Sequence, residues 1–398
     1  MSKTEKLKQR VMAQVDARSD ELIHLADTIH ANPEIAFEEH ESAELLCQVL
    51  EANGFVVQRG AANLETAFVA ALPGGNDAPT IAFLAEYDAL PGLGHACGHN
   101  LIGASAVGAG LALQAVLPEL DGTIQVIGTP AEEGGGGKVY MVEAGVFDGV
   151  DAALIVHPSS KNKTRGTSLT SFKISIEFFG KPAHAAGAPD MGVNALDAVI
   201  QTYNGINALR QHLRDDARVH GIITHGGDAP NIVPKYAAAR FYVRAADVPY
   251  TEEMIEKVRA CAEGAALTTG ARLEFKEYAP HYENMLSNPV LADLAEANMA
   301  TLGIKVSPPQ KKERMGSTDM GNVTQVVPGL HPSIAIGPED MGGHTAEFCA
   351  AAASPAGHKG MIQAAKLMAM TAIDLLVEPA NLAKARAAFK KQKARQGE

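Results

Sequence analysis

Several features are scarce or missing in this sequence, and each absence narrows what the chain can be. No run of about eighteen apolar residues is present, and the longest apolar stretch, residues 101–117, is rich in Gly and Ala, which indicates a buried helix. The charged N-terminus lacks the apolar segment of a secretory signal. Cysteines are few and scattered, which favours a reducing, cytoplasmic compartment over a disulfide framework. They are Cys47, Cys97, Cys261 and Cys349.

Charge is also limited, because only 20% of the residues are charged while 46% are hydrophobic. This composition is typical of a globular protein. The net charge is −12 and the pI about 5.6, which argues against nucleic acid or an anionic membrane as the main partner. No internal repeat is visible. A length of 398 residues is too great for one ordinary core and predicts two domains.

The outer parts of the chain alternate between helical and strand-like patterns. Helical apolar spacing covers about residues 4–30, and a long Ala-rich helix is expected over about 355–376. Short apolar runs between them are expected to be strands. They are residues 67–72, 80–87, 123–128, 151–158 and 333–337. Apolar strands alternating with helices predict an α/β fold, a sheet with helices on both faces.

The middle of the chain has a different pattern. Residues 171–180 alternate between polar and apolar, which predicts a half-exposed strand with a possible open edge. The order that follows is strand–helix–strand–strand–helix–strand, a compact α+β sandwich. We therefore expect an inserted lid or dimerisation domain over 170–283, within a catalytic domain formed by 1–169 and 284–398.

The strongest local motif is the His-Ala-Cys-Gly-His sequence at residues 95–99. Cysteine thiolate and neutral imidazole are ligands for borderline metals such as zinc, so Cys97 and His99 are candidate ligands. By itself the motif is also compatible with a packing feature ahead of a helix.

A second motif, Glu132-Glu133 followed by the glycines 134–137, comes after an expected strand. Adjacent carboxylates repel one another, so a buried pair needs a cation or a proton. One of the two can then bind metal while its neighbour faces the metal-bound water. The alternative is a solvated pair before a helix N-terminus, where acidic residues are favourable.

Two single histidines complete the candidate set. His157 ends an expected strand, where α/β sheets place functional groups, and His344 lies in a Gly-Gly-His-Thr sequence. A lone histidine is more often structural than a ligand. Taken together, however, the four motifs supply sulfur, nitrogen and oxygen ligands from strand ends and glycine-rich loops, which favours a metal site.

The order of these motifs resembles the amidohydrolase branch of the aminoacylase/carboxypeptidase G metallopeptidase family. That branch includes hippurate hydrolases, N-acetyl-amino-acid deacetylases and auxin-conjugate hydrolases. The Gly-Ser-Thr-Asp sequence at 316–319 is most similar to the sub-branch of the p-aminobenzoyl-glutamate hydrolase catalytic subunit and similar dipeptidases. Much of the branch has Glu where this chain has Thr318, which we interpret as a difference in specificity. The six motifs are residues 95–100, 130–137, 156–158, 180–186, 230–234 and 343–345.

The resemblance implies a metal-dependent amidohydrolase that cleaves the amide bond of an N-acyl amino acid, an aminobenzoyl-glutamate-like compound or a dipeptide. It implies two divalent ions, Zn²⁺ or Mn²⁺, with Glu132 as general base and Asp88 orienting a ligand. The implied metal ligands are Cys97, His99, Glu133, His157 and His344.

Three residues of the expected inserted domain are candidates for binding the substrate or stabilising the oxyanion. An oxyanion needs a hydrogen-bond donor, and His184, in a Gly- and Pro-flanked turn, is the candidate. The resemblance implies that it acts in the partner subunit's site of a homodimer. Asn231 and Arg244 match family residues that bind the substrate carboxylate or carbonyl, and arginine suits a carboxylate. Without the resemblance, each residue has an ordinary structural explanation: a turn histidine for His184, a turn amide for Asn231 and an exposed charge on a strand for Arg244.

Two other functions stay open at this stage. Hydrolytic deamination or aromatic aminohydrolysis would use the same ligands and differ only in its products. A non-catalytic binding subunit would have lost ligands or the base, whereas this chain keeps all of them. The acyl group, the amino acid and the native metal are not fixed by the sequence.

Overall fold

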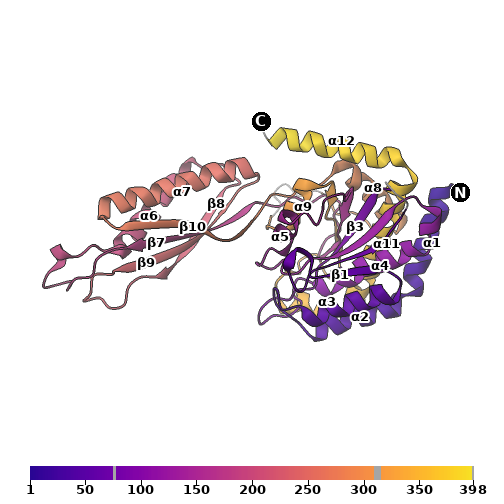
Figure 1. Cartoon of the computed structure of the whole chain (residues 1–398), viewed down its shortest axis with the longest axis horizontal. Coiled ribbons are helices and arrows are strands. Elements are labelled where there is room, and N and C mark those ends of the chain that lie inside the picture. Colours follow the sequence, from indigo (N-terminus) through magenta and orange to yellow (C-terminus); the bar gives the residue numbers. More distant parts are fainter. Residues whose placement is uncertain (75–77, 309–314, 397–398) are drawn as a thin grey trace.

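The computed structural model describes residues 1–74, 78–308 and 315–396. It has two lobes (Figure 1), a larger one formed by both ends of the chain and a smaller one formed by residues 171–282. The sheets of the two lobes are separate, with six strands in the larger lobe's main sheet and four in the smaller lobe's sheet.

The main sheet has the strand order β1-β2-β4-β3-β5-β11. Strands β3, β4, β5 and β11 run parallel, whereas β1 and β2 join them in antiparallel pairing. The sheet is therefore mixed. Its strands are β1 (Val56–Arg59), β2 (Phe68–Leu72), β3 (Thr80–Ala85), β4 (Thr123–Gly128), β5 (Ala152–Leu154) and β11 (Gly329–Leu330). A separate parallel pair is formed by β6 (His157–Ser159) and β12 (Ser333–Ala335).

Strand β3 shows how the sheet is buried on both faces. Its side chains alternate: Ile81 and Phe83 belong to a core shared with the long helices, whereas Ala82 and Leu84 belong to a second core on the opposite face. Helices thus cover both faces, as expected. They are α1 (Lys3–Ala17), α2 (Ser19–Ala31), α3 (His40–Ala52), α4 (His99–Gln114), α5 (Gly137–Glu143), α8 (Pro289–Thr301), α9 (Met320–Val326), α10 (Ala346–Ala351), α11 (Pro355–Val377) and α12 (Pro379–Gln396).

The N-terminal helical pattern is divided into two helices rather than one. Helix α1 ends and α2 begins at Arg18, whose φ of −106° and ψ of 9° are not helical. Leu7 and Val11 before the break and Leu22 after it are all buried, so the apolar spacing continues across it. The spacing therefore could not reveal the break.

Helix α11 is long and apolar enough to cross a membrane by composition, but 78% of its most apolar window is buried inside the protein. It packs beside α4 and α1 in the larger core. Its apolar character is thus that of a core helix. The following α12 is mostly exposed and carries many Lys and Arg side chains, as a solvated helix does.

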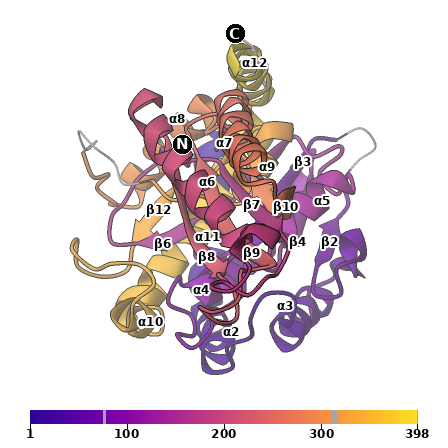
Figure 2. The ribbon, with the colours of Figure 1, turned by 90° about the vertical axis from the view of Figure 1, so that its left-hand side faces the viewer.

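The smaller lobe is an antiparallel sheet covered by two helices (Figure 2). Its chain order matches the expected strand–helix–strand–strand–helix–strand. The elements are β7 (Ser171–Phe179), α6 (Ala195–Leu209), β8 (Arg218–His225), β9 (Tyr236–Arg244), α7 (Val248–Thr269) and β10 (Arg272–Tyr282).

The expectation of a half-exposed first strand with a possible open edge was wrong in both respects. Strand β7 is not an edge, because it pairs with β10 on one side and with β9 on the other, and most of its residues are buried. One open edge is instead β8, where Ile222 is 66% exposed and Ile223 is 44% exposed. Alternation indicates which face a side chain is on and does not identify the strands that pair on either side, so it could not locate the edge.

Candidate metal centre

The candidate ligands gather where the parallel strands of the main sheet end. Asp88 follows β3, the Glu132-Glu133 turn follows β4, and His157 comes shortly after β5. Cys97 precedes α4, and His99 is the first residue of that helix. The carboxyl edge of a parallel sheet is the usual place for a functional site, because successive loops meet there.

Short distances join these groups. Cys97 Sγ lies 3.4 Å from His157 Nε2, and Glu133 Oε1 lies 3.1 Å from His344 Nε2. Three overlapping sets have ligand atoms within 4.8 Å of one another. The sets are Cys97–His99–His157, Cys97–Glu133–His344 and His99–Glu132–Glu133. The structure therefore brings all five predicted ligands and Glu132 into one cluster.

Asp88 fixes two members of this cluster. Its carboxylate accepts a hydrogen bond from His99 Nδ1 at 2.7 Å and another from the Glu133 backbone N–H at 2.9 Å. Because Nδ1 of His99 is held by Asp88, its Nε2 is directed to the cluster. A carboxylate that orients a metal-binding histidine acts in the same way. Similarly, His157 Nδ1 donates to the Pro158 carbonyl at 2.5 Å, which leaves its Nε2 near Cys97.

The cluster has the properties of a cation site. His99 Nε2 is buried and has no hydrogen-bond partner among the described residues. Burial raises the pKa of the Cys97 thiol to about 12 and, together with Glu86 and Asp319, raises the pKa of Glu132. Buried anionic groups of this kind are costly unless a cation compensates them. The sulfur, nitrogen and oxygen donors fit a divalent ion such as zinc.

The glycine run after Glu133 is required by close packing. A Cβ on Gly137 would lie 2.0 Å from the Pro130 carbonyl oxygen, and one on Gly135 would lie 2.6 Å from the Ala131 Cβ. Gly136 has a φ of 73°. Side chains at these positions would push the turn apart, so the glycines allow Glu132 and Glu133 to sit in a tight turn.

A buried ion cluster beside the site was not predicted. Lys138 Nζ lies 2.6 Å from Glu86 Oε1 and 2.7 Å from Asp319 Oδ1. Burial alone would raise the pKa of Glu86, but the Lys138 ammonium and the nearby imidazoles of His99 and His331 together outweigh it, and the pKa falls to about 2. Glu86 directly follows β3, two residues before Asp88, so its place at the carboxyl end of a predicted strand was a usable signal. No signal in the sequence indicated a buried lysine.

The predicted residues of the smaller lobe are divided between its two ends. Arg244 lies at the inner end, where its Nη1 donates to Ser317 Oγ at 3.3 Å. His184 and Asn231 lie on exposed loops past the outer end of β7, and these loops touch, since the Ala185 N–H donates to the Asn231 carbonyl at 3.0 Å. The fold thus places His184 and Asn231 with each other but away from the ligands of their own chain.

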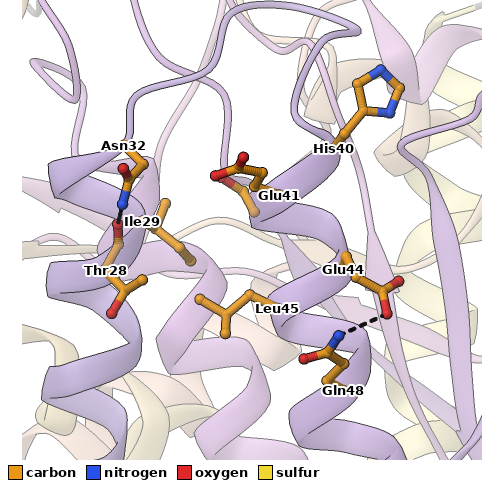
Figure 3. A pocket seen from close by; sticks show the side chains of 9 residues that line it. Thr28, Ile29, Asn32, His40, Glu41, Glu44, Leu45 and Gln48 are labelled. Carbon is orange, nitrogen blue, oxygen red and sulfur yellow. Dashed lines mark hydrogen bonds between the residues drawn. The ribbon is translucent and has the colours of Figure 1, made fainter.

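A separate hollow of about 440 Å³ lies between α2 and α3 (Figure 3). Ile29 and Leu45 lie between the two helices, with Thr28, Asn32 and Gln48 around them. None of the predicted ligands lines it. This hollow is therefore separate from the candidate metal centre, which is identified by the convergence of donor atoms.

Sulfur, imidazole and carboxylate donors at the carboxyl edge of a mixed α/β sheet define this chain as a candidate metalloprotein, and the comparisons with known proteins show its class. The chain matches peptidase family M20/M25/M40 over residues 82–367. It is 39% identical to the Xaa-Arg dipeptidase of Mus musculus over 97% of this chain and 93% of that protein. It is 33% identical to one of the subunits of the p-aminobenzoyl-glutamate hydrolase of Escherichia coli, over 92% of this chain and 91% of that subunit.

Solved structures agree with the fold. An aminobenzoyl-glutamate utilization protein of Klebsiella pneumoniae superposes with a TM-score of 0.75 at 22% identity, covering 92% of this chain and 98% of that one. A dinuclear metal binding peptidase of Bacillus subtilis gives 0.68 at 25% identity, covering 91% and 99%. The chain therefore belongs to peptidase family M20/M25/M40. It is a metallo-amidohydrolase of that family, as the sequence motifs predicted.

Proposed function

We propose that the enzyme cleaves dipeptides with a free carboxylate, with aminobenzoyl-glutamate-like compounds and N-acyl amino acids as the neighbouring substrate classes. The three overlapping donor sets, one of which includes Glu132, carry the hydrolytic part of this proposal. The preference for dipeptides is supported by the 39% identity, along nearly the whole chain, to a protein named Xaa-Arg dipeptidase.

The proposed site holds two divalent ions, zinc or manganese, on the ligands Cys97, His99, Glu133, His157 and His344. When bound, the ions would polarise the scissile carbonyl and lower the pKa of the attacking water toward about 7. Asp88 keeps His99 and the Glu133 backbone in place through the hydrogen bonds described above.

Glu132 is the proposed general base. Its carboxylate takes the proton from the attacking water as the C–O bond forms, and it returns that proton to the amine nitrogen as the C–N bond breaks. The raised pKa of Glu132 suits this exchange, because an efficient proton carrier titrates nearer the working pH than an ordinary glutamate does.

We assign the remaining roles to the smaller lobe, which we propose to be an inserted lid and dimerisation domain over 170–283 in a catalytic domain of 1–169 and 284–398. Arg244 and Asn231 would bind the substrate carboxylate or carbonyl, and His184 would stabilise the oxyanion. Strand β7 has nine residues, so at about 3.3 Å per residue its ends are roughly 30 Å apart. His184, past the outer end, is therefore better placed for a partner's site.

The dimer is supported by the exposed isoleucines of the edge strand β8, since an open apolar edge favours pairing with a second chain. The scattered cysteines, and the burial that raises the pKa of Cys47 to about 12, are compatible with a reducing cytoplasm. We accordingly propose a cytoplasmic homodimer.

A product-resolved screen tests the substrate class. Enzyme loaded with zinc or with manganese is incubated with Xaa-Arg dipeptides, aminobenzoyl-glutamate and N-acetyl amino acids, and Glu132→Gln enzyme gives the background. We expect the dipeptides to be cleaved to free amino acids with a higher kcat/KM than the other two substrate classes. Faster release of aminobenzoate or acetate would contradict the dipeptide preference, and release of ammonia would indicate aminohydrolysis instead.

A further inference from the structure

The turn that carries Glu132 and Glu133 begins at a residue in an unusual conformation. Ala131 is completely buried and has a φ of 61°, in the left-handed region that favours glycine. An alanine stays in this region only where its surroundings hold it. The direction of the next side chain, Glu132, depends on that backbone, so whatever holds Ala131 also aims the proposed base.

One carboxylate makes the holding contact. Glu39 Oε1 accepts a hydrogen bond from the Ala131 N–H at 2.8 Å, and Glu39 Oε2 accepts another from Thr66 Oγ1 at 3.0 Å. Glu39 itself is completely buried. Without this carboxylate the buried Ala131 amide would lose its acceptor, and an unpaired buried amide is strongly unfavourable.

The segment around Glu39 is itself fixed to the site. Phe37 lies against the same turn, because a Cβ on Gly135 would come within 2.8 Å of its ring. The Glu34 carbonyl accepts from the Ala89 N–H at 2.7 Å, and its side chain accepts from the backbone of Glu41 and Ser42 at the start of α3. Residues 34–42 therefore brace both the Asp88 loop and the Glu132 turn. Figure 3 shows the beginning of α3 at His40, directly after Glu39.

We propose that Glu39 is a positioning residue for Glu132, acting by holding the Ala131 amide in the left-handed turn. The inference rests on the proposed role of Glu132 as base. Glu39 does not touch the reacting atoms; it keeps the Glu132 carboxylate within reach of them. Its effect is thus expected in kcat rather than in substrate affinity.

Two substitutions at position 39 test whether the oxygen that accepts from the Ala131 N–H is needed, independently of the carboxylate charge. Glu39→Gln keeps an oxygen for the Ala131 N–H, and the Thr66 hydroxyl can rotate to accept from the new amide. Glu39→Leu fills a similar volume and offers no acceptor. In the metal-loaded enzyme we expect Glu39→Gln to keep kcat within about threefold and Glu39→Leu to lose about a hundredfold, the loss typical of a misplaced catalytic group.

Rescue and a matched control exclude a general loss of structure. Ala131→Gly, added to Glu39→Leu, removes the left-handed strain and should recover about tenfold of the lost kcat. Asp374, in α11, is a matched control, because it is another buried carboxylate and is not part of the proposed site. It accepts a hydrogen bond from Asn298 Nδ2 at 2.9 Å and pairs with Lys8. Asp374→Leu should lower the melting temperature and leave kcat unchanged.

A second measurement does not depend on catalysis. Hydrogen exchange at the Ala131 amide should become at least about tenfold faster in Glu39→Leu than in Glu39→Gln, because a freed amide loses its protection. If Glu39→Leu does not fold, Glu39→Asp replaces it, since the shorter side chain withdraws the acceptor and keeps the charge.

Equal kcat in Glu39→Leu and Glu39→Gln, whether high or low, would overturn the positioning role, as would unchanged exchange at Ala131. The failure of the base assignment looks different. If Glu132→Gln retained kcat, the proposed function would fail, and the exchange result would still decide whether Glu39 holds the turn.

Discussion

At the scale of single residues, the two adjacent glutamates have different surroundings. Glu133 lies 3.1 Å from His344 and its pKa is lowered, although burial alone would raise it, whereas the pKa of Glu132 is raised by burial and by Glu86. A group that stays ionised suits a metal ligand, and a group that holds its proton more readily suits a base. The surroundings of the two glutamates are therefore those expected for the two proposed roles.

Substitutions at the two glutamates should separate these roles. Glu132→Gln keeps the shape and removes the proton acceptor, so kcat is expected to fall by about a hundredfold to ten-thousandfold with metal content unchanged. Glu133→Gln should instead lower the metal content. Elemental analysis and kinetics on the same preparations provide the measurement, and a Glu132→Gln enzyme with most of its kcat would contradict the assignment.

Metal binding should release protons and strengthen as the pH rises. Burial raises the pKa of Cys97 to about 12, so at neutral pH the metal-free thiol is protonated and must lose its proton to bind. Below that pKa, affinity is expected to increase by about tenfold per pH unit for each proton released. Calorimetry in buffers of different ionisation enthalpy counts the protons. Cys97→Ala should release one fewer, and an unchanged count would argue against Cys97 as a ligand.

The sequence revealed most of this cluster because the ligands lie in short motifs with recognisable chemistry. It did not reveal Glu39 or Lys138, whose contacts join segments far apart in the chain: Glu39 reaches Ala131 and Lys138 reaches Asp319. An isolated acidic or basic residue gives no sign of burial. Only the fold, which brings such segments together, shows that their charges act on the site.

At the scale of elements, the two strands that connect the lobes touch the turn of the proposed base. Tyr282, the last residue of β10, donates its hydroxyl to the Glu132 carbonyl at 2.8 Å. Lys173, near the start of β7, donates to the Gly134 carbonyl at 3.0 Å. The root of the smaller lobe therefore contacts the backbone on both sides of Glu133, and movement of this lobe would be transmitted to the turn.

Removing one of these contacts should reduce turnover modestly. Tyr282→Phe deletes the hydrogen bond to the Glu132 carbonyl, and the loss of about 1 kcal/mol for one such bond corresponds to roughly a fivefold lower kcat. Tyr278→Phe on the same strand is the control, since the Tyr278 ring stacks under Arg240 and keeps that contact without its hydroxyl. Steady-state kinetics decide: equal kcat in both variants would show that the root does not support the turn.

Element types were largely predictable, and connections between elements were not. Hydrophobic periodicity located β2, β3, β4 and β5 of the main sheet and the order of the smaller lobe, but it did not locate β1 or β11. It did not find the break at Arg18, because buried positions continue in phase across it, and it placed the open edge on β7 rather than on β8. Pairing partners come from distant segments, so a pattern within one strand cannot identify its neighbours.

At the scale of the whole molecule, the location of His184 allows a decisive test of a shared site. His184→Ala chains are mixed with Glu132→Gln chains, each expected to be inactive alone. If His184 acts in the partner's site, every mixed dimer has one complete site. Random exchange then restores about a quarter of wild-type activity, by the symmetry of the dimer. Background activity after demonstrated subunit exchange would rule out sharing.

The strands that leave and re-enter the larger lobe are direct neighbours, since Ser171 at the start of β7 pairs with Tyr282 at the end of β10. The chain ends that would remain without residues 171–282 are therefore about one strand spacing apart, roughly 5 Å. A short turn could join them without disturbing the main sheet. The smaller lobe thus has the geometry of a module acquired through a single insertion. A chain shortened by residues 171–282 is expected to keep the main sheet and all five predicted metal ligands.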